Sequence, residues 1–198
     1  MQQEIEAKFL NVNHDEIRMQ LKKLGAVCKQ PQRLMRRRNF DFPDRKLQKD
    51  GGWVRLRDEL SGVTLTYKQV KEWDINGVFE AMVGVDDYEK ASDFLKAVGL
   101  KAYSNQESKR EVWQLKDVEI MLDEWPWVKP ILEIEAPSQQ QVQSLATDLG
   151  LNWSDAVFGS VEPVYMAEYD ITMPEFYDID TITFNNPVPD WLEKKRKK

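Results

Sequence analysis

Alternation of charged and apolar residues along short segments is the feature that most constrains how this chain folds. It occurs in EIEAKF at residues 4–9, in VRLR at 54–57, in VTLTYK at 63–68 and in LEIEA at 132–136. In an extended strand, alternate residues share a face. Each of these segments therefore predicts a strand with one apolar face and one polar or charged face.

Turn signals and helical spacing place the remaining elements. We expect strands at 2–10, 33–42, 52–58, 62–69, 77–85, 107–115, 117–123 and 130–136, and amphipathic helices at 14–24, 87–98 and 138–149. Closure of a sheet into a barrel removes its edges and turns one face inward. Because the helices need an apolar face to cover, we expect an α+β fold in which an eight-stranded antiparallel β-barrel, a tunnel, has helices packed outside.

The pattern weakens beyond Gly150, where prolines interrupt the rest of the chain. We expect one tunnel domain over residues 1–172, which includes a C-terminal lid or helix. An extension over 173–198 then ends in a basic, flexible tail.

In a closed barrel the charged face becomes the interior. The segment MRRRNF leaves the inward face open, because Arg36 and Arg38 lie on one parity and Arg37 on the other, and SKREVW offers either Arg110 or Lys109. We expect Arg36, Arg38 and Arg110 inside. The interior acids are then Glu4, Glu6, Glu80, Asp123, Glu133 and Glu135, and the interior bases are Lys8, Arg36, Arg38, Arg55, Arg57, Lys68 and Arg110.

The alternative is a solvated outer face, which is the usual meaning of any one such segment. Sorting of acids and bases onto different strands favours the interior. Unpaired charges cannot be buried dry, so the tunnel would hold water and a ligand that carries both signs. Arginines and lysines suit phosphate, and clustered carboxylates suit Mg²⁺ or Mn²⁺. A metal-bound polyphosphate meets both requirements.

Composition excludes several other classes of function. Cys28 is the only cysteine and His14 the only histidine, which removes disulfides, cysteine zinc sites and histidine-dependent nucleophiles. The net charge of −6 argues against nucleic-acid binding. We find no membrane-spanning stretch, and acids occupy residues 1–25 where a signal peptide would be apolar, so we expect a cytoplasmic protein.

The ordered motifs resemble a known family. EIEAK at 4–8 is similar to the E-x-E-x-K signature of the CYTH superfamily, the triphosphate tunnel metalloenzymes, which include class IV adenylate cyclases, thiamine triphosphatases and inorganic tripolyphosphatases. WVRLR at 53–57, TYK at 66–68, SKREVW at 108–113, LDE at 122–124 and LEIEA at 132–136 occur after it in the family's order. The resemblance covers about residues 1–150 and implies the same tunnel fold.

The resemblance also implies roles for the charged residues. Glu4 and Glu6 would hold one or two divalent cations, Mg²⁺ or Mn²⁺, together with Asp123, Glu133 and Glu135, and Glu80 would be a further metal or water partner. The triphosphate would be bound by Arg36, Arg38, Arg55, Arg57, Lys68 and Arg110. Lys8 would contact phosphate or position the attacking water, which makes Lys8, Glu4 and Glu6 the expected catalytic residues.

These motifs define the ligand class better than the product. We expect a triphosphatase acting on tripolyphosphate or on a small organic triphosphate such as ATP or thiamine triphosphate. The alternatives are a class IV adenylate cyclase, which converts ATP to cyclic AMP and pyrophosphate, and a non-catalytic polyphosphate or nucleotide binder. Trp125 and Trp127 would stack on an organic group or pack on the outer surface. The protein would be a monomer or a homodimer, with no membrane or specific nucleic-acid partner.

Overall fold

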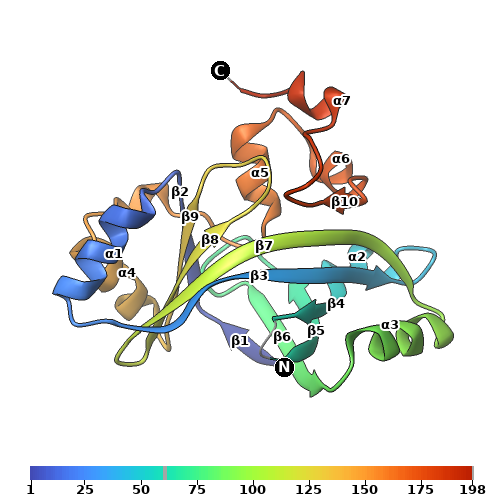
Figure 1. Cartoon of the computed structure of the whole chain (residues 1–198), viewed down its shortest axis with the longest axis horizontal. Helices are drawn as coiled ribbons and strands as arrows, with labels where there is room; N and C mark the ends of the chain where they lie inside the picture. The colour runs from blue at the N-terminus through green and yellow to red at the C-terminus, as the bar shows by residue number, and fades with distance from the viewer. Residues whose placement is uncertain (60–61, 198) are drawn as a thin grey trace.

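One β-sheet curls on itself at the centre of the molecule (Figure 1), and its inner face lines a central cavity. The computed structural model describes residues 1–59 and 62–197. The sheet runs in the order β1-β6-β5-β4-β3-β7-β8-β9-β2, and β10 pairs with β7. Its strands are β1 (Gln2–Glu4), β2 (Glu6–Leu10), β3 (Val27–Asp41), β4 (Gly52–Asp58), β5 (Val63–Val70), β6 (Val78–Val85), β7 (Lys101–Leu115), β8 (Val118–Glu124), β9 (Ile131–Glu135) and β10 (Thr181–Ile182).

The antiparallel barrel predicted from the sequence is confirmed, but the number of strands is not. The two ends of the sheet order, β1 and β2, are separated in the chain by Ile5 alone, so the sheet nearly closes on itself. The expected strand 2–10 counts as two because β1 pairs with β6 whereas β2 pairs with β9. The described chain adds β10, which runs parallel to β7, and this gives ten strands instead of eight.

Three long helices cover the outer face of the sheet, as expected. They are α1 (His14–Lys23), α3 (Tyr88–Ala97) and α4 (Gln139–Asp148). Their N-caps are Asn13, Asp87 and Ser138, whose side chains accept hydrogen bonds from backbone N–H groups of the first turn. Helices α1 and α4 bury apolar side chains against the outer faces of β2, β8 and β9. Helix α3 buries Leu95 against Phe40 and Leu56. The apolar parity of the strands therefore faces outward, and the polar parity faces the cavity.

The C-terminal residues form a second packed layer (Figure 1). It contains α5 (Glu162–Glu168), α6 (Met173–Tyr177) and α7 (Asp190–Glu193), and a 3-10 turn (Trp153–Asp155) precedes it. The short helix α2 (Lys46–Lys49) is not part of this layer and connects β3 to β4. The hydroxyls of Tyr165 and Tyr169 donate hydrogen bonds to the carbonyls of Pro126 and Trp127, at 2.8 and 2.7 Å. These helices therefore pack against the β8–β9 loop.

The basic end of the chain, for which we expected a flexible tail, makes defined contacts in its described part. Lys195 pairs with Glu175. The guanidinium of Arg196 lies 4.6 Å from the centre of the Tyr169 ring, and the Lys197 amide donates a hydrogen bond of 2.9 Å to the Glu168 carbonyl. Among the helices that the structure describes, none combines the length and apolar character needed to cross a bilayer.

Candidate active site

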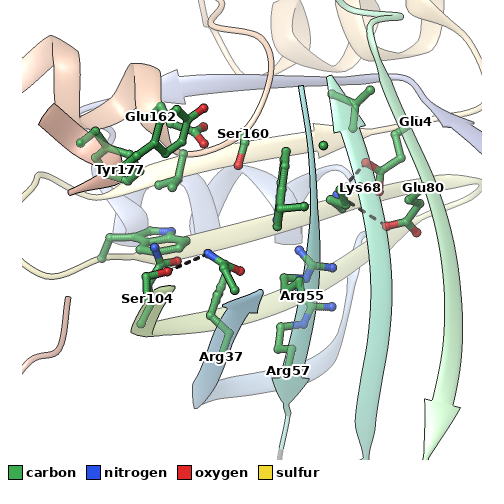
Figure 2. Close-up of a pocket in the computed structure, with 18 of the residues that line it drawn as sticks. Glu4, Arg37, Arg55, Arg57, Lys68, Glu80, Ser104, Ser160, Glu162 and Tyr177 are labelled. Atoms are coloured by element: carbon green, nitrogen blue, oxygen red, sulfur yellow. Dashed lines mark hydrogen bonds and ion pairs between the residues drawn. The ribbon is translucent and has the colours of Figure 1, made fainter. Parts of the chain in front are cut away.

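The barrel interior holds a charged cavity of about 340 Å³, within the size range of small-molecule sites. Most of the residues expected from the sequence line it: Glu4, Glu6, Lys8, Arg55, Arg57, Lys68, Glu80, Arg110, Asp123, Glu133 and Glu135. Glu162 and Tyr177 line it from the C-terminal layer (Figure 2). The cavity therefore gathers acids and bases from strands that are distant in the sequence.

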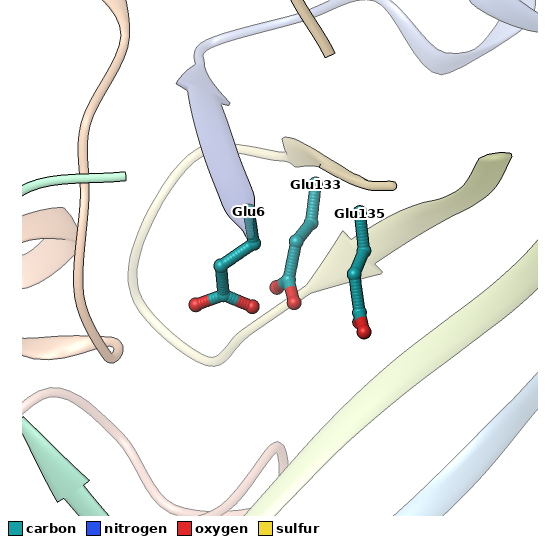
Figure 3. Close-up of side chains that lie close together, drawn as sticks. All are labelled: Glu6, Glu133 and Glu135. Atoms are coloured by element: carbon teal, nitrogen blue, oxygen red, sulfur yellow. The ribbon is translucent and has the colours of Figure 1, made fainter. Parts of the chain in front are cut away.

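Three of the acids form one compact cluster (Figure 3). Each of Glu6, Glu133 and Glu135 offers a carboxylate oxygen, and these oxygens lie within 4.8 Å of one another. The β2–β9 register causes this, because Glu6 lies opposite Glu135 and Lys8 lies opposite Glu133. Oxygen-only donors that converge in this way suit a hard divalent cation such as Mg²⁺ or Mn²⁺.

Electrostatics within the cluster supports the same interpretation. Burial and the neighbouring Glu133 raise the pKa of Glu6 to about 8. Burial, Glu133 and Glu4 raise the pKa of Glu135 to about 7. Burial also opposes ionisation of Glu133, but Lys8 and Arg110 outweigh it and hold the pKa of Glu133 well below its usual range. Repulsion and burial thus favour the protonated forms of Glu6 and Glu135, and a bound cation would allow all three carboxylates to ionise.

Lys8 is held firmly beside this cluster. Its Nζ donates hydrogen bonds of 2.6 Å to Glu6 Oε1 and 2.6 Å to the Gly159 carbonyl, and lies 3.7 Å from Glu133 Oε2. Burial acts to lower the pKa of Lys8, but Glu133 and Glu6 outweigh it and raise that pKa above its usual value. Lys8 is therefore a fixed cation and does not accept a proton at neutral pH.

The remaining expected metal ligands are engaged by bases. Lys68 Nζ lies 2.6 Å from Glu4 Oε2 and 3.6 Å from Glu80 Oε2 (Figure 2). Arg110 binds both oxygens of Asp123, at 2.7 and 2.5 Å. Arg110 also lies 3.2 Å from Glu133 Oε2, so it bridges Asp123 to the compact cluster, whereas Glu4 and Glu80 share Lys68.

Three arginines on the adjacent strands β3 and β4, namely Arg37, Arg55 and Arg57, face the cavity (Figure 2). Burial and then Arg57 lower the pKa of Arg55 to about 9, and burial together with Arg57 and Arg55 lowers the pKa of Arg37 well below its usual value. The Nε atoms of Arg37, Arg55 and Arg57 have no hydrogen-bond partner within residues 1–59 and 62–197. Because arginine stays charged in proteins, this crowding favours a polyanion.

Arg37 occupies the place that we expected for Arg36 and Arg38. It lies directly opposite Arg57 in the β3–β4 register, and cross-strand partners share a face. Arg36 points outward and lies 2.7 Å from Asp58, and Arg38 lies 2.7 Å from Glu89 on α3. Phe40 indicates which face of β3 is the outer one. It shares the parity of Arg36 and Arg38 and is buried beneath α3, so Arg36 and Arg38 lie on the outer face and Arg37 on the inner face.

Trp125 and Trp127 occupy different environments. Trp125 is buried, lines the cavity and lies under the Arg37 guanidinium, 4.3 Å from the ring centre. Trp127 donates its indole N–H to the Asn186 carbonyl. Glu162 and Tyr177, by contrast, had no signal in the sequence, since they lie where strand periodicity is lost.

Comparison with known proteins identifies a family for most of the chain. The CYTH domain family model matches residues 2–153. A protein from Pyrococcus horikoshii OT3 has a similar structure, with 22% identity, a TM-score of 0.69 and coverage of 81% of this chain and 98% of its own. A putative adenylate cyclase from Vibrio parahaemolyticus has 16% identity, a TM-score of 0.73 and coverage of 83% and 98%.

A putative adenylyl cyclase from Hippeastrum, described as having a dominant triphosphatase activity, is also similar in structure. It has 14% identity, a TM-score of 0.59 and coverage of 79% of this chain and 91% of its own. At these identities the solved structures establish the fold. No curated protein matches the chain in sequence. The family match ends before Ser160, Glu162 and Tyr177, which the C-terminal layer brings to the cavity.

Proposed function

Because the chain belongs to the CYTH domain family, we propose that it is a divalent-metal-dependent hydrolase of inorganic tripolyphosphate or a small organic triphosphate. The observation that carries this proposal is one cavity with two opposed charge clusters. Glu6, Glu133 and Glu135 converge on β2 and β9, and Arg37, Arg55 and Arg57 crowd together on β3 and β4, which lie across the nearly closed sheet from β2 and β9. A non-catalytic anion binder would need the bases alone.

The residues divide the work of triphosphate hydrolysis. Glu6, Glu133 and Glu135 would hold Mg²⁺ or Mn²⁺, which polarises phosphate oxygens when bound. Arg37, Arg55 and Arg57 neutralise the triphosphate charge with donors that are already in place, so little reorganisation accompanies the reaction. Water attacks the terminal phosphorus, and the bond to the bridging oxygen breaks.

Lys8 contributes as a cation beside the acid cluster. Its raised pKa excludes it as a general base, so contact with phosphate or orientation of the attacking water remain its two proposed roles. Glu4, Glu80 and Asp123 keep proposed supporting roles through their pairs with Lys68 and Arg110.

Adenylate cyclase activity is the second candidate, and the name of the Vibrio structure favours it, whereas the Hippeastrum protein is described as having a dominant triphosphatase activity. In that reaction the ribose 3′-hydroxyl attacks the α-phosphorus of ATP and pyrophosphate leaves. The two chemistries share charge neutralisation and differ in which nucleophile lies in line.

The decisive experiment incubates the purified chain with tripolyphosphate, ATP or thiamine triphosphate, in Mg²⁺ or Mn²⁺, and identifies the products by chromatography. We expect orthophosphate and the corresponding diphosphate, or pyrophosphate from tripolyphosphate. We also expect Glu6→Gln to abolish turnover, whereas Glu16→Gln on the outer helix α1 does not. Cyclic AMP with pyrophosphate would establish the cyclase instead, and tight binding without turnover under both metals would establish a binder.

A further inference from the structure

The C-terminal layer brings an acid to the cavity that the metal cluster and the arginines do not use. Glu162 begins α5, has 5% of its surface exposed and lines the cavity with Ser160 and Tyr177. Figure 2 shows these three residues on one side of the cavity and the Glu4–Lys68–Glu80 set on the other. Glu162 therefore forms part of a separate region of the wall.

One oxygen of Glu162 is buried without a partner. Its Oε2 makes no hydrogen bond with any residue that the structure describes. Burial raises the pKa of Glu162, against the influence of the Ser160 and Tyr177 hydroxyls and of Lys8. An unpaired buried carboxylate oxygen is costly in stability, so its position at a cavity wall indicates that a ligand atom completes it.

A run of aromatic rings ends at Tyr177, whose hydroxyl interacts with Glu162. Trp125, Tyr165, Phe176 and Tyr177 form a continuous run, with successive ring centres 6.5, 5.1 and 6.0 Å apart. Trp125, Phe176 and Tyr177 also line the cavity. A largely aromatic wall that carries a buried carboxylate oxygen suits a flat ring with an N–H donor.

The same region is unsuited to phosphate. A carboxylate repels a further phosphate group, whereas Arg37, Arg55 and Arg57 on β3 and β4 attract one. A bound triphosphate at the arginines thus leaves the C-terminal wall for an uncharged or cationic organic group.

We propose that Glu162 accepts a hydrogen bond from an amino-substituted heteroaromatic ring of an organic triphosphate, with Ser160, Tyr177, Phe176 and Trp125 forming the subsite. The inference rests on the proposed function and narrows its substrate class from tripolyphosphate to organic triphosphates. It assigns substrate specificity to a segment that lies outside the matched family domain.

The test measures kcat/KM of the full chain for ATP, thiamine triphosphate, purine riboside triphosphate and tripolyphosphate. Purine riboside triphosphate differs from ATP only by lacking the 6-amino group. For Glu162→Ala, the kcat/KM of the preferred amino-bearing substrate relative to tripolyphosphate should fall about tenfold to a hundredfold. Where ATP is that substrate, its advantage over purine riboside triphosphate should disappear as well. Glu168→Ala, in the same helix and facing Lys129, is the matched control.

Equal losses for tripolyphosphate and the ring-bearing substrates, or no loss at all, would overturn the subsite. A wild-type protein that turns over tripolyphosphate but binds neither ATP nor thiamine triphosphate would also overturn it, while the hydrolase proposal stands. If nothing is turned over, the hydrolase proposal fails, and calorimetric binding of the same compounds still tests Glu162. Thermal unfolding of Glu162→Ala and the isosteric Glu162→Gln shows whether each variant is folded.

Discussion

At the scale of single residues, the site stores unfavourable electrostatics on both sides of one cavity. Repulsion and burial raise the pKa of Glu6 and Glu135, and the same two causes lower the pKa of Arg37 and Arg55. Neither the glutamates nor the arginines can move far apart to reduce this repulsion, because strand pairing fixes the backbone that carries each side chain. A ligand that brings both cation and polyanion removes both penalties at once.

The first prediction concerns pH and the metal-free protein. Unfolded glutamate titrates near pH 4.3, whereas the pKa is about 8 for Glu6 and about 7 for Glu135 in the fold. These raised values contribute stability that is complete below about pH 4 and is lost as pH rises toward 8. We therefore expect the free energy of unfolding without metal to fall from pH 5.5 to 8.5, measured by urea denaturation.

Divalent metal should reverse this trend, because binding displaces the protons from the cluster. The stabilisation by Mg²⁺ should be larger at pH 8.5 than at pH 5.5. Glu133 does not change how the free energy of unfolding varies between pH 5.5 and 8.5, since its lowered pKa affects stability only in more acidic solution. Metal-free stability that climbs steadily from pH 5.5 to 8.5 would contradict the assignment of the cluster.

Strand parity in the sequence was sufficient to place most of the charged side chains in the cavity, including Glu6, Glu133, Arg55 and Arg57. It gave no information on which charges pair. Whether Asp123 meets Arg110 or the acid cluster depends on the stagger of β8 against β7 and β9, which only the closed sheet determines. The parity of Arg37 was available through Phe40, because a buried phenylalanine fixes the outer face of β3.

At the scale of elements, β3 shows how one strand serves two surfaces. Its pairing with β7 contains register shifts between Cys28 and Gln30, between Gln30 and Arg33, and between Asn39 and Phe40. Such irregularities increase local twist and let a long strand follow a curved sheet. Between these shifts, from Arg33 to Asn39, the register is regular, and ordinary strand alternation makes Arg37 face the cavity and Arg36 the exterior.

The second prediction uses this contrast. Arg37→Ala should raise the KM for the triphosphate substrate about tenfold to a hundredfold, because it removes a buried charge-assisted donor. Arg36→Ala should change KM by less than about twofold, since it removes only an exposed ion pair. Steady-state kinetics of both variants with one substrate provides the comparison. A larger effect for Arg36 would reverse the assigned faces.

The helices were predictable for a local reason, and the strand number was not. Asn13, Asp87 and Ser138 cap α1, α3 and α4 within a few residues of each start, so the signal lies in neighbouring sequence. The division of residues 2–10 into two strands depends instead on β6 and β9, which lie far along the chain. Pairing between strands that are distant in the chain produces no comparable signal in the neighbouring sequence.

At the scale of the whole molecule, Gly159 joins the C-terminal layer to the barrel. Its carbonyl accepts the hydrogen bond from Lys8, its φ is +90°, and a Cβ there would lie 2.4 Å from the Trp73 ring. The backbone just before it, at Val157, forms an isolated bridge with Lys8. One position thus links β2, the β5–β6 loop and the C-terminal layer.

The third prediction is that Gly159→Ala lowers both stability and turnover. The positive φ costs about 1 to 2 kcal/mol for alanine, and the ring contact adds to that cost. Gly150→Ala is the matched control, because Gly150 has a φ of +71° but open space around its Cβ position. We expect similar conformational penalties, a larger total loss of unfolding free energy for Gly159→Ala, and a fall in kcat for Gly159→Ala alone. Equal effects of the two substitutions would argue against a role for Gly159 in positioning Lys8.

The C-terminal layer could not be derived from sequence periodicity. Its helices have four to seven residues, and they pack through scattered aromatic residues such as Tyr165, Tyr169 and Phe176. The sequence of this layer therefore shows only where prolines interrupt regular structure. Its position over the cavity depends on tertiary contacts with the β8–β9 loop.

The division of the first strand at Ile5 has a consequence for how the protein reaches its native state. Gln2–Glu4 must find β6, and Glu6–Leu10 must find β9, before the sheet can close. Contacts between such distant parts of a chain form slowly, because a large loop must be ordered first. The acid cluster forms only when Glu6–Leu10 pairs with β9, so added Mg²⁺ should slow unfolding without accelerating refolding.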